Sequence, residues 1–414
     1  MKKIHYAWVI CAIGMIMMVC NMGLSSNILS VYLPFIEQNR ITGAQGSSII
    51  SIRCLSTFVG TFFVSWYYEK LSLRNGLTLA TVMSGIGIVL FAFAGGNIWI
   101  YYLGAIILGI GYAFGTMFGI SLLIKNWFSS AKGTALGLCS MGTGLATILF
   151  TPFITSNTLK NGLASSCLVQ AGFMFLCAVL AFVFIRTSPE EKGLAPYSNG
   201  KNTKEKKTVE NRNKVENFTI PTLIWGEMLL MMFFMGGAGQ TCSSHISIAV
   251  STAGYTKQIA GISTTIYGVF LIVGKVSYGP LADKIGSLKA TIVSILFFFA
   301  ASFTTLWLNG TSLAPIYIFP VLLGLGCPFF TVGCTLWAED LSPSSSFEKT
   351  LKWFQIMYSA GGIVVTAIPG RIADVTGEYK SSYLLLSAML LIALLLLLSF
   401  YKKRKTGYRK KMAG

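Results

Sequence analysis

The sequence predicts an all-α integral membrane protein with twelve transmembrane helices in two halves of six. First, 54% of the 414 residues are hydrophobic and only 11% are charged, whereas a soluble globular domain carries about 25% charged residues. Second, apolar runs of about 20 residues, the length that crosses about 30 Å of hydrocarbon, recur along the whole chain. Third, a polar and charged segment at 186–219 separates six such runs from six others.

The twelve runs are joined by short connections, as in a compact helical bundle. In order along the chain they are expected at 7–34, 43–66, 76–95, 98–124, 133–154, 165–185, 220–248, 258–280, 288–308, 313–337, 351–371 and 382–401. Each of the eight tryptophans falls within a few residues of the end of a run, at the headgroup depth that the indole ring prefers. The first run is too long for a signal-peptide core and has no small-x-small cleavage site, so we expect a retained span.

The domain organisation follows from these spans. We expect a six-helix bundle over 1–185, a solvated linker over 186–219, a second six-helix bundle over 220–401 and a basic tail over 402–414. Glycines give the fourth and fifth runs small-residue faces on which neighbouring helices can approach closely; they are Gly104, Gly109, Gly111, Gly115, Gly133, Gly137, Gly142 and Gly144. The glycine-rich segment 236–245 and the Gly-Pro segment 324–330 are expected to bend the seventh and tenth spans.

The formal net charge of +18 is distributed very unevenly over the loops. If the N-terminus is cytoplasmic, 25 of the 32 basic residues lie on the cytoplasmic side, and only five lie outside: Arg40, Lys160, Lys257, Arg371 and Lys380. Because loop Lys and Arg residues favour the cytoplasmic side, we expect both termini and the linker there, in the cell membrane. The positive charge therefore reports topology and does not indicate a nucleic-acid partner.

The cysteine and histidine residues indicate neither a metal site nor an enzyme. The nine cysteines are odd in number and all lie in apolar runs, where sulfur acts as a small hydrophobe. No CxxC pair and no Cys/His cluster of metal-ligand spacing occurs, so we expect no disulfide framework, metal or cofactor. With two histidines in the whole chain, no clustered nucleophile, base and metal ligand can be assembled.

The loops after the second and eighth runs repeat one pattern. The second copy reads Gly279-Pro-Leu-Ala-Asp283-Lys284-Ile-Gly286-Ser-Leu-Lys289, and the first copy aligns Glu69 with Asp283, Lys70 with Lys284 and Ser72 with Gly286. This pattern, together with twelve spans in two halves, resembles the major facilitator superfamily over the whole chain. The resemblance implies a latch that sets the balance between outward-open and inward-open states, formed by Glu69, Lys70, Arg74, Gly279, Asp283, Lys284, Gly286 and Lys289.

Three further segments resemble the oxalate/formate antiporter and monocarboxylate transporter branch of that superfamily: His5–Val9, Asn126–Gly137 and Arg186–Pro196. The branch's oxalate carriers place a cation where this chain has Lys275, but a second cation in the eleventh span is replaced here by glycine near Gly361. The acid that monocarboxylate members carry one turn before the eighth-span cation is here Leu271. The resemblance therefore does not extend to a double-cation site or to an acid/cation pair for proton coupling.

Two cations lie inside the predicted spans. Arg53 stands near the middle of the second span, and Lys275 stands eight residues before Asp283 in the eighth. A cation at mid-bilayer costs at least about 2.5–3.5 kcal/mol, so each is a candidate substrate ligand. Arg53 has the alternative of a structural bond to backbone carbonyls, and Lys275 those of snorkelling or an internal ion pair. None of the 14 acidic residues lies at mid-membrane, so we expect an electropositive cavity with an anionic guest.

Neutral candidates for that cavity come first from the spans that line the pathway in this superfamily, the first, fourth, seventh and tenth. They are Asn27 and Tyr32 in the first span and Gln240 and His245 in the seventh. Tyr358, in the eleventh span, is a further candidate for a hydrogen bond into the cavity. His245 is a candidate for substrate binding or proton transfer, with a packing role as the alternative. Tyr358 has core packing as its alternative.

We expect a secondary transporter that moves a small organic anion by rocking its two halves about a central site. The chain has no P-loop, so the driving force would be a coupling proton or a counter-anion, in symport or antiport. The expected partners are the anionic substrate and the lipid bilayer, with the protein acting as a monomer. Two alternatives remain open from the sequence: a multidrug exporter of the same fold, and a membrane sensor that binds a ligand without moving it.

Overall fold

The chain folds into helices joined by short turns, which confirms the predicted fold class. The computed structural model describes residues 5–37, 41, 43–198, 222–366, 368–369, 372 and 380–412. Within these ranges the only β-pairing is an isolated bridge between Phe128 and Tyr197. Residues 199–219 of the expected linker lie outside the described residues, as do Arg40 and Arg371. The chain forms two compact units, Met1–Asn199 and Gly200–Gly414.

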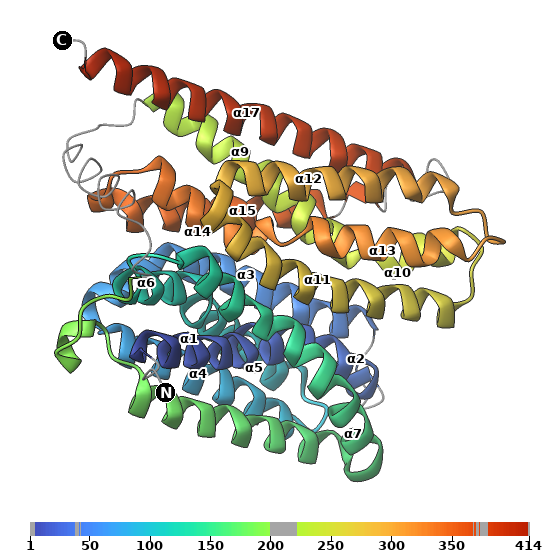
Figure 1. Ribbon diagram of the computed structural model, residues 1–414. Coiled ribbons are helices and arrows are strands. Elements are labelled where there is room, and N and C mark those ends of the chain that lie inside the picture. The colour runs from blue at the N-terminus through green and yellow to red at the C-terminus, as the bar shows by residue number, and fades with distance from the viewer. Residues whose placement is uncertain are drawn as a thin grey trace. The chain divides into compact units, whose positions relative to one another are not determined.

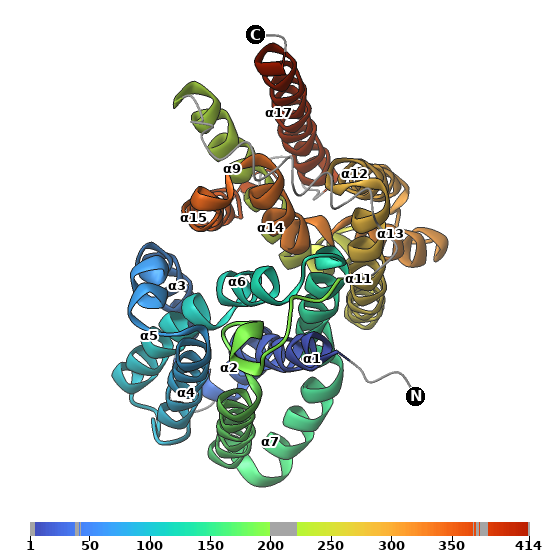
Figure 2. The same cartoon turned by 60° about the vertical axis from the view of Figure 1, so that its left-hand side comes forward.

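The first unit contains the helices that begin the chain (Figure 1). They are α1 (Tyr6–Met18), the π-helix η1 (Val19–Asn27), α2 (Leu29–Glu37), α3 (Gly43–Lys70), α4 (Leu73–Ala92), α5 (Ile98–Gly115), α6 (Met117–Trp127), α7 (Lys132–Phe184) and the 3-10 turn η2 (Pro189–Lys192). Gly162, with φ 83°, interrupts α7. Figure 2 shows the two limbs of α7 on either side of this turn, and they correspond to the fifth and sixth expected spans.

The second unit is built from the helices that follow the linker. They are α9 (Thr222–Ser244), α10 (Ile246–Thr252), α11 (Lys257–Ile285), α12 (Ser287–Thr304), η3 (Thr305–Trp307), α13 (Ala314–Gly326), α14 (Phe329–Leu341), η4 (Ser344–Ser346), α15 (Phe347–Val365) and α17 (Lys380–Met412). Among the described residues of the whole chain, ten helical segments are long and apolar enough to cross a membrane. One of them is the interrupted α7, and the eleventh expected span corresponds to α15.

Among the described residues, four spans are interrupted or widened within their length, and they are the first span of each three-helix set. The first span widens into the π-helix η1, and the seventh turns at His245 between α9 and α10. The fourth breaks at Thr116 (φ −106°, ψ −141°) between α5 and α6. The tenth breaks at Cys327 and Pro328 between α13 and α14, as the Gly-Pro segment predicts. Irregular helices free backbone carbonyls and amides, which is how membrane transporters expose polar groups to a ligand.

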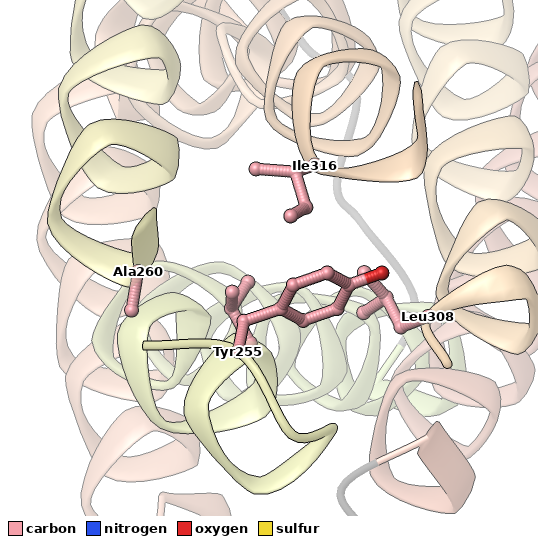
Figure 3. Packing of buried hydrophobic residues seen from close by; sticks show 5 residues of the cluster. Tyr255, Ala260, Leu308 and Ile316 are labelled. Carbon is pink, nitrogen blue, oxygen red and sulfur yellow. The ribbon is translucent and has the colours of Figure 1, made fainter. Parts of the chain in front are cut away.

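Two loops at one end of the second unit close on a small apolar cluster. Tyr255, between α10 and α11, directs its ring toward Leu308, with Ile316 above it (Figure 3). The Tyr255 hydroxyl donates to the carbonyl of Ser312 at 2.6 Å, so the buried ring keeps a hydrogen-bond partner. These contacts join the ends of α10, α11, η3 and α13 into one body.

Candidate functional site

Arg53 is buried in the first unit, with only 8% of its surface exposed. Its Nη2 donates to the Sγ of Cys54 at 3.2 Å, a weak acceptor, and its guanidinium carbon lies 5.3 Å from the ring centre of Tyr112 on α5. Its Nε–H has no hydrogen-bond partner, and no carboxylate pairs with it among the residues that the structure describes. A buried guanidinium with an unsatisfied donor is a strong attractor for an anion.

The close packing of α3 on α5 fixes this arrangement. Gly109 lies against the backbone of Arg53, since a Cβ there would stand 2.5 Å from the Arg53 carbonyl oxygen. The Thr57 hydroxyl lies 3.0 Å from the carbonyl oxygens of both Arg53 and Gly109. Tyr112 follows Gly109 by three residues, which places both on one helix face, so the same contact brings the Tyr112 ring to the guanidinium.

Lys275 is the corresponding buried cation of the second unit, with 3% of its surface exposed. Its neighbour Gly274 packs at the break of the tenth span, because a Cβ there would lie 2.6 Å from Pro328 Cγ and 2.8 Å from the Gly324 carbonyl oxygen. The thiol of Cys327, in that break, is a titratable group near the Lys275 ammonium. Lys275 therefore directly follows a residue that packs against the break of the tenth span.

Gln240 and Tyr358 lie together at the crossing of α9 and α15. The Gln240 Nε2 donates to the Tyr358 carbonyl at 3.3 Å, and Gly362 packs directly on the Gln240 amide, where a Cβ would lie 2.2 Å from Cδ. Gly361 and Gly362, which stand where a second cation is found in the oxalate carriers, therefore leave no room for a side chain on α15. His245 lies in the turn that follows α9, and its Nδ1 donates to the Thr241 carbonyl at 3.0 Å.

Asn27 and Tyr32 face α7, where their hydrogen-bond partners lie. Asn27 is exposed, and its Nδ2 donates to the Thr147 hydroxyl at 2.9 Å. Tyr32 is fully buried, and its hydroxyl donates to the Gln170 side-chain oxygen at 2.8 Å. Gln170 in turn donates to the Leu24 carbonyl at 3.2 Å, within the π-helix. In this conformation Tyr32 holds the irregular part of the first span to α7.

The two repeated loops differ in how they join their helices. In the second copy Gly286 has φ 90°, a value that side chains tolerate poorly, and it separates α11 from α12. In the first copy Ser72 caps α4 instead, because its hydroxyl accepts from the Asn75 N–H at 3.3 Å. Gly279 is buried, whereas the charged latch candidates Glu69, Lys70, Asp283, Lys284 and Lys289 are exposed on their own units.

Arg74, also expected in the latch, binds the end of α7. Its Nε donates to the Phe182 carbonyl at 2.6 Å, and its guanidinium lies 4.0 Å over the Phe182 ring. Three more side chains donate to carbonyls that follow the last helical bonds of α7: Tyr6 to Phe184 at 2.7 Å, Trp127 to Arg186 at 2.8 Å and Asn126 to Thr187 at 3.0 Å. Carbonyls at a helix C-terminus have no partner within the helix, so these donors and the Arg74 charge stabilise that end.

This helix end also brings together the three segments that resemble the oxalate/formate and monocarboxylate branch. Tyr197 pairs with the backbone at Trp127, accepting from Ser129 and donating to Trp127 at 3.0 and 2.8 Å. Its ring packs edge-on against His5 and Trp8. The first twelve residues of the expected linker are therefore folded onto the first unit.

Comparison with known proteins identifies the chain's relatives. The sequence model described as Major Facilitator Superfamily matches residues 14–309 and 228–413. Probable transporter MCH2 of Saccharomyces cerevisiae is 26% identical over 300 residues, which span 71% of this chain and 60% of MCH2. The multi-drug resistance efflux pump PmrA of Streptococcus pneumoniae is 21% identical over 87% of this chain and 88% of PmrA. Monocarboxylate transporter 12 of Rattus norvegicus is 22% identical over 92% of this chain and 82% of that protein.

Solved structures give the same result for the fold. The crystal structure of FucP, a Major Facilitator Superfamily transporter in the outward conformation, matches with a TM-score of 0.71. The match covers 95% of this chain and 98% of FucP at 15% sequence identity. At that identity the likeness concerns the arrangement of helices and carries no information on the substrate.

Proposed function

The chain belongs to the Major Facilitator Superfamily and is a multi-pass membrane transporter, and we propose that its cargo is a small organic anion, most simply a carboxylate. Arg53 and Lys275 would be the attractive charges, and the further polar groups proposed for the pathway are Asn27, Tyr32, Gln240, His245 and Tyr358. Transport would be driven by exchange for a second anion or by a coupled proton. The protein would act as a monomer in the cell membrane, with both termini cytoplasmic as the loop charges indicate.

The observation that carries this proposal is the unsatisfied guanidinium of Arg53. Burying a charge without a partner costs several kcal/mol per ion, so a buried cation is retained only where something repays that cost. The Tyr112 ring covers part of the guanidinium, while the Nε–H has no hydrogen-bond partner among the described residues. A carboxylate can accept from guanidinium N–H groups in a charge-assisted, bidentate geometry. Monocarboxylate transporter 12, a relative over 92% of this chain, bears a name that agrees with such a cargo.

The number of buried cations in the second unit bears on the charge of the anion. Lys275 is the one buried cation that the structure describes there, and α15 packs glycine to backbone where a second would stand. We therefore propose that Lys275 binds a single carboxylate group of the cargo, as Arg53 does in the first unit, and that the cargo carries no cluster of negative charges. The residues of the repeated loops would set the balance between transport states: Glu69, Lys70, Arg74, Gly279, Asp283, Lys284, Gly286 and Lys289.

Uptake into proteoliposomes tests this function directly. Radiolabelled formate, lactate, oxalate and succinate would be offered outside vesicles that are either empty or loaded with the same anions, with and without a proton gradient. We expect saturable uptake of one or more of these anions, stimulated by internal anion or by the gradient. The similarity to PmrA favours a second candidate, a multidrug exporter. Transport of amphiphilic cations with no transport of any carboxylate would support that candidate and contradict ours.

Cys54 offers a test of the electropositive site that needs no knowledge of the cargo. Of the nine cysteines only Cys54 is partly exposed, and its Sγ lies 3.2 Å from the Arg53 Nη2. We expect the negatively charged reagent MTSES to modify Cys54 at least about tenfold faster than the positively charged MTSET, relative to a small free thiol, because the guanidinium attracts the anion. Mass spectrometry of the intact chain, after the reaction is quenched at successive times, would give both rates.

The matched variants for this labelling are Cys54→Ser and Arg53→Gln. Cys54→Ser should abolish modification by both reagents, since the other eight thiols are buried. Arg53→Gln should remove the preference for MTSES. A faster reaction with the cationic reagent in the unaltered protein would show that the site repels anions.

A further inference from the structure

Helix α17 is longer than a membrane span requires. Its 33 residues, Lys380–Met412, rise about 50 Å at 1.5 Å per residue, against about 30 Å of hydrocarbon. The apolar span within it ends at Lys403. Nine helical residues, 404–412, continue for about 14 Å beyond that point. Figure 2 shows these last turns of α17, in dark red, projecting beyond the other helices of the same unit.

Two polar contacts fix the place where α17 leaves the span. The Lys403 Nζ binds both carboxylate oxygens of Glu227 on α9, at 2.8 and 2.9 Å. Two residues earlier along the chain, the Tyr401 hydroxyl donates to Asp340 at 3.0 Å and lies 2.8 Å from the Ser287 hydroxyl, which itself donates to Asp340. Glu227 and Asp340 thus hold α17 against α9 and α12 just before the extension begins.

The extension carries a dense positive charge with no acid of its own. Five of the seven cations between positions 402 and 411 lie in the extension, namely Arg404, Lys405, Arg409, Lys410 and Lys411, and residues 380–414 contain no Asp or Glu. Like charges repel along a helix when they are three or four residues apart, as Lys405 is from Lys402 and from Arg409. Lys402 and Lys403, whose side chains the structure describes, are exposed. A helical segment of this charge needs a negative surface beside it.

We propose that the helical extension of α17 binds the anionic phospholipid headgroups of the leaflet from which it emerges. The membrane surface is the negative partner that is always within reach, because the extension begins where the hydrocarbon ends. Clusters of four to eight Lys or Arg residues directly beside a membrane span are attracted to anionic lipid, each cation adding to the binding. The inference is independent of the proposed cargo, since it rests on a different helix and different residues.

Hydrogen bonds connect α17, just before the extension, to the end of the repeated loop in the second unit. Tyr401, three residues before the extension, shares Asp340 with Ser287, and Ser287 is the first residue of α12 after Gly286. Headgroups that hold the extension would therefore also hold the hydrogen-bonded contact between α17 and the start of α12.

Native mass spectrometry of the full-length chain in uncharged detergent tests the proposal. Phosphatidylglycerol and phosphatidylcholine would be titrated separately against the unaltered protein and against a variant with Lys405→Gln, Arg409→Gln, Lys410→Gln and Lys411→Gln. We expect phosphatidylglycerol to bind in preference, and the variant to lose at least about tenfold in apparent affinity for it. Raising the salt concentration should weaken binding to the unaltered protein more than to the variant, because salt screens exposed charges.

The matched control removes the same charge from the linker, through Lys201→Gln, Lys204→Gln, Lys206→Gln and Lys207→Gln. It should retain the preference for phosphatidylglycerol. An equal loss in the control would assign the effect to net charge, and an unchanged affinity in the α17 variant would place the lipid elsewhere. Either result, or equal binding of phosphatidylcholine, would overturn the proposal whatever the transport assays give.

Discussion

Replacing Arg53 with glutamine is expected to lower the initial rate of organic-anion uptake by about 30-fold or more. The expectation follows from the loss of a charge-assisted contact in a buried site, which costs about 2–5 kcal/mol, and about 1.4 kcal/mol corresponds to a factor of ten. Glutamine keeps part of the length and polarity of arginine, so the packing of α3 on α5 should persist. Uptake at equal protein per vesicle, with the fold checked by gel filtration and thermal unfolding, measures the effect.

Two further variants make this experiment specific. Arg53→Lys keeps the charge but loses the planar fork and its contact with the Tyr112 ring, so uptake should fall less than with glutamine. Lys160→Gln removes one exposed positive charge from the same unit and should leave uptake unchanged. If Arg53→Gln transported organic anions at the normal rate, the proposed role of this residue would be lost, while the fold would stand.

Replacing Gly236 with alanine is expected to destabilise the second unit by at least about 3 kcal/mol. A Cβ at Gly236 would lie 1.9 Å from the Tyr358 carbonyl oxygen, and one at Gly361 would lie 1.9 Å from the Phe233 carbonyl oxygen. Helices α9 and α15 thus touch backbone to backbone on both sides of their crossing, and they must separate to admit a methyl group. Inserting even one carbon into a close-packed contact costs about 1–3 kcal/mol, and here backbone atoms are the obstacle.

Gly226 supplies the control on the same helix. No atom lies within 4 Å of a Cβ placed there, and alanine is the better helix former by about 0.5–1 kcal/mol, so Gly226→Ala should be neutral or slightly stabilising. Thermal unfolding in detergent compares the two variants. Equal unfolding temperatures for Gly236→Ala and Gly226→Ala would mean that the α9–α15 contact is looser than the structure indicates.

The glycine contacts and the interrupted spans are packing features that the sequence predicts. Gly109 was expected to permit close helix contact, and it lies against the Arg53 backbone. The kink predicted from Pro328 and its neighbouring glycines is the break between α13 and α14. In each case the property belongs to the residue itself: glycine has no side chain to hold helices apart, and proline lacks the N–H that would continue the helix.

The sequence predicts only part of the candidate site. The sequence identified Arg53 as a cation within a span. Nothing in the sequence marks Cys54 as its hydrogen-bond acceptor, and only a three-residue spacing from Gly109 points to Tyr112. The Tyr32 hydroxyl bonds Gln170, which is 138 positions away, and Arg74 bonds the Phe182 carbonyl, which is 108 positions away. No local pattern indicates either partner, and the substrate role of Tyr32 and the latch role of Arg74 stay predictions.

The sequence by itself determined that the chain is an all-α membrane protein, where its spans lie and that two cations stand within them. These properties are sums over neighbouring residues, because hydropathy and charge act on each segment independently of its partners. The tertiary structure alone decided which side chains satisfy one another. That choice depends on the rotation of each helix about its axis and on the distance at which it crosses its neighbours, as the contacts of Gly236 with Tyr358 and of Gly109 with Arg53 fix them.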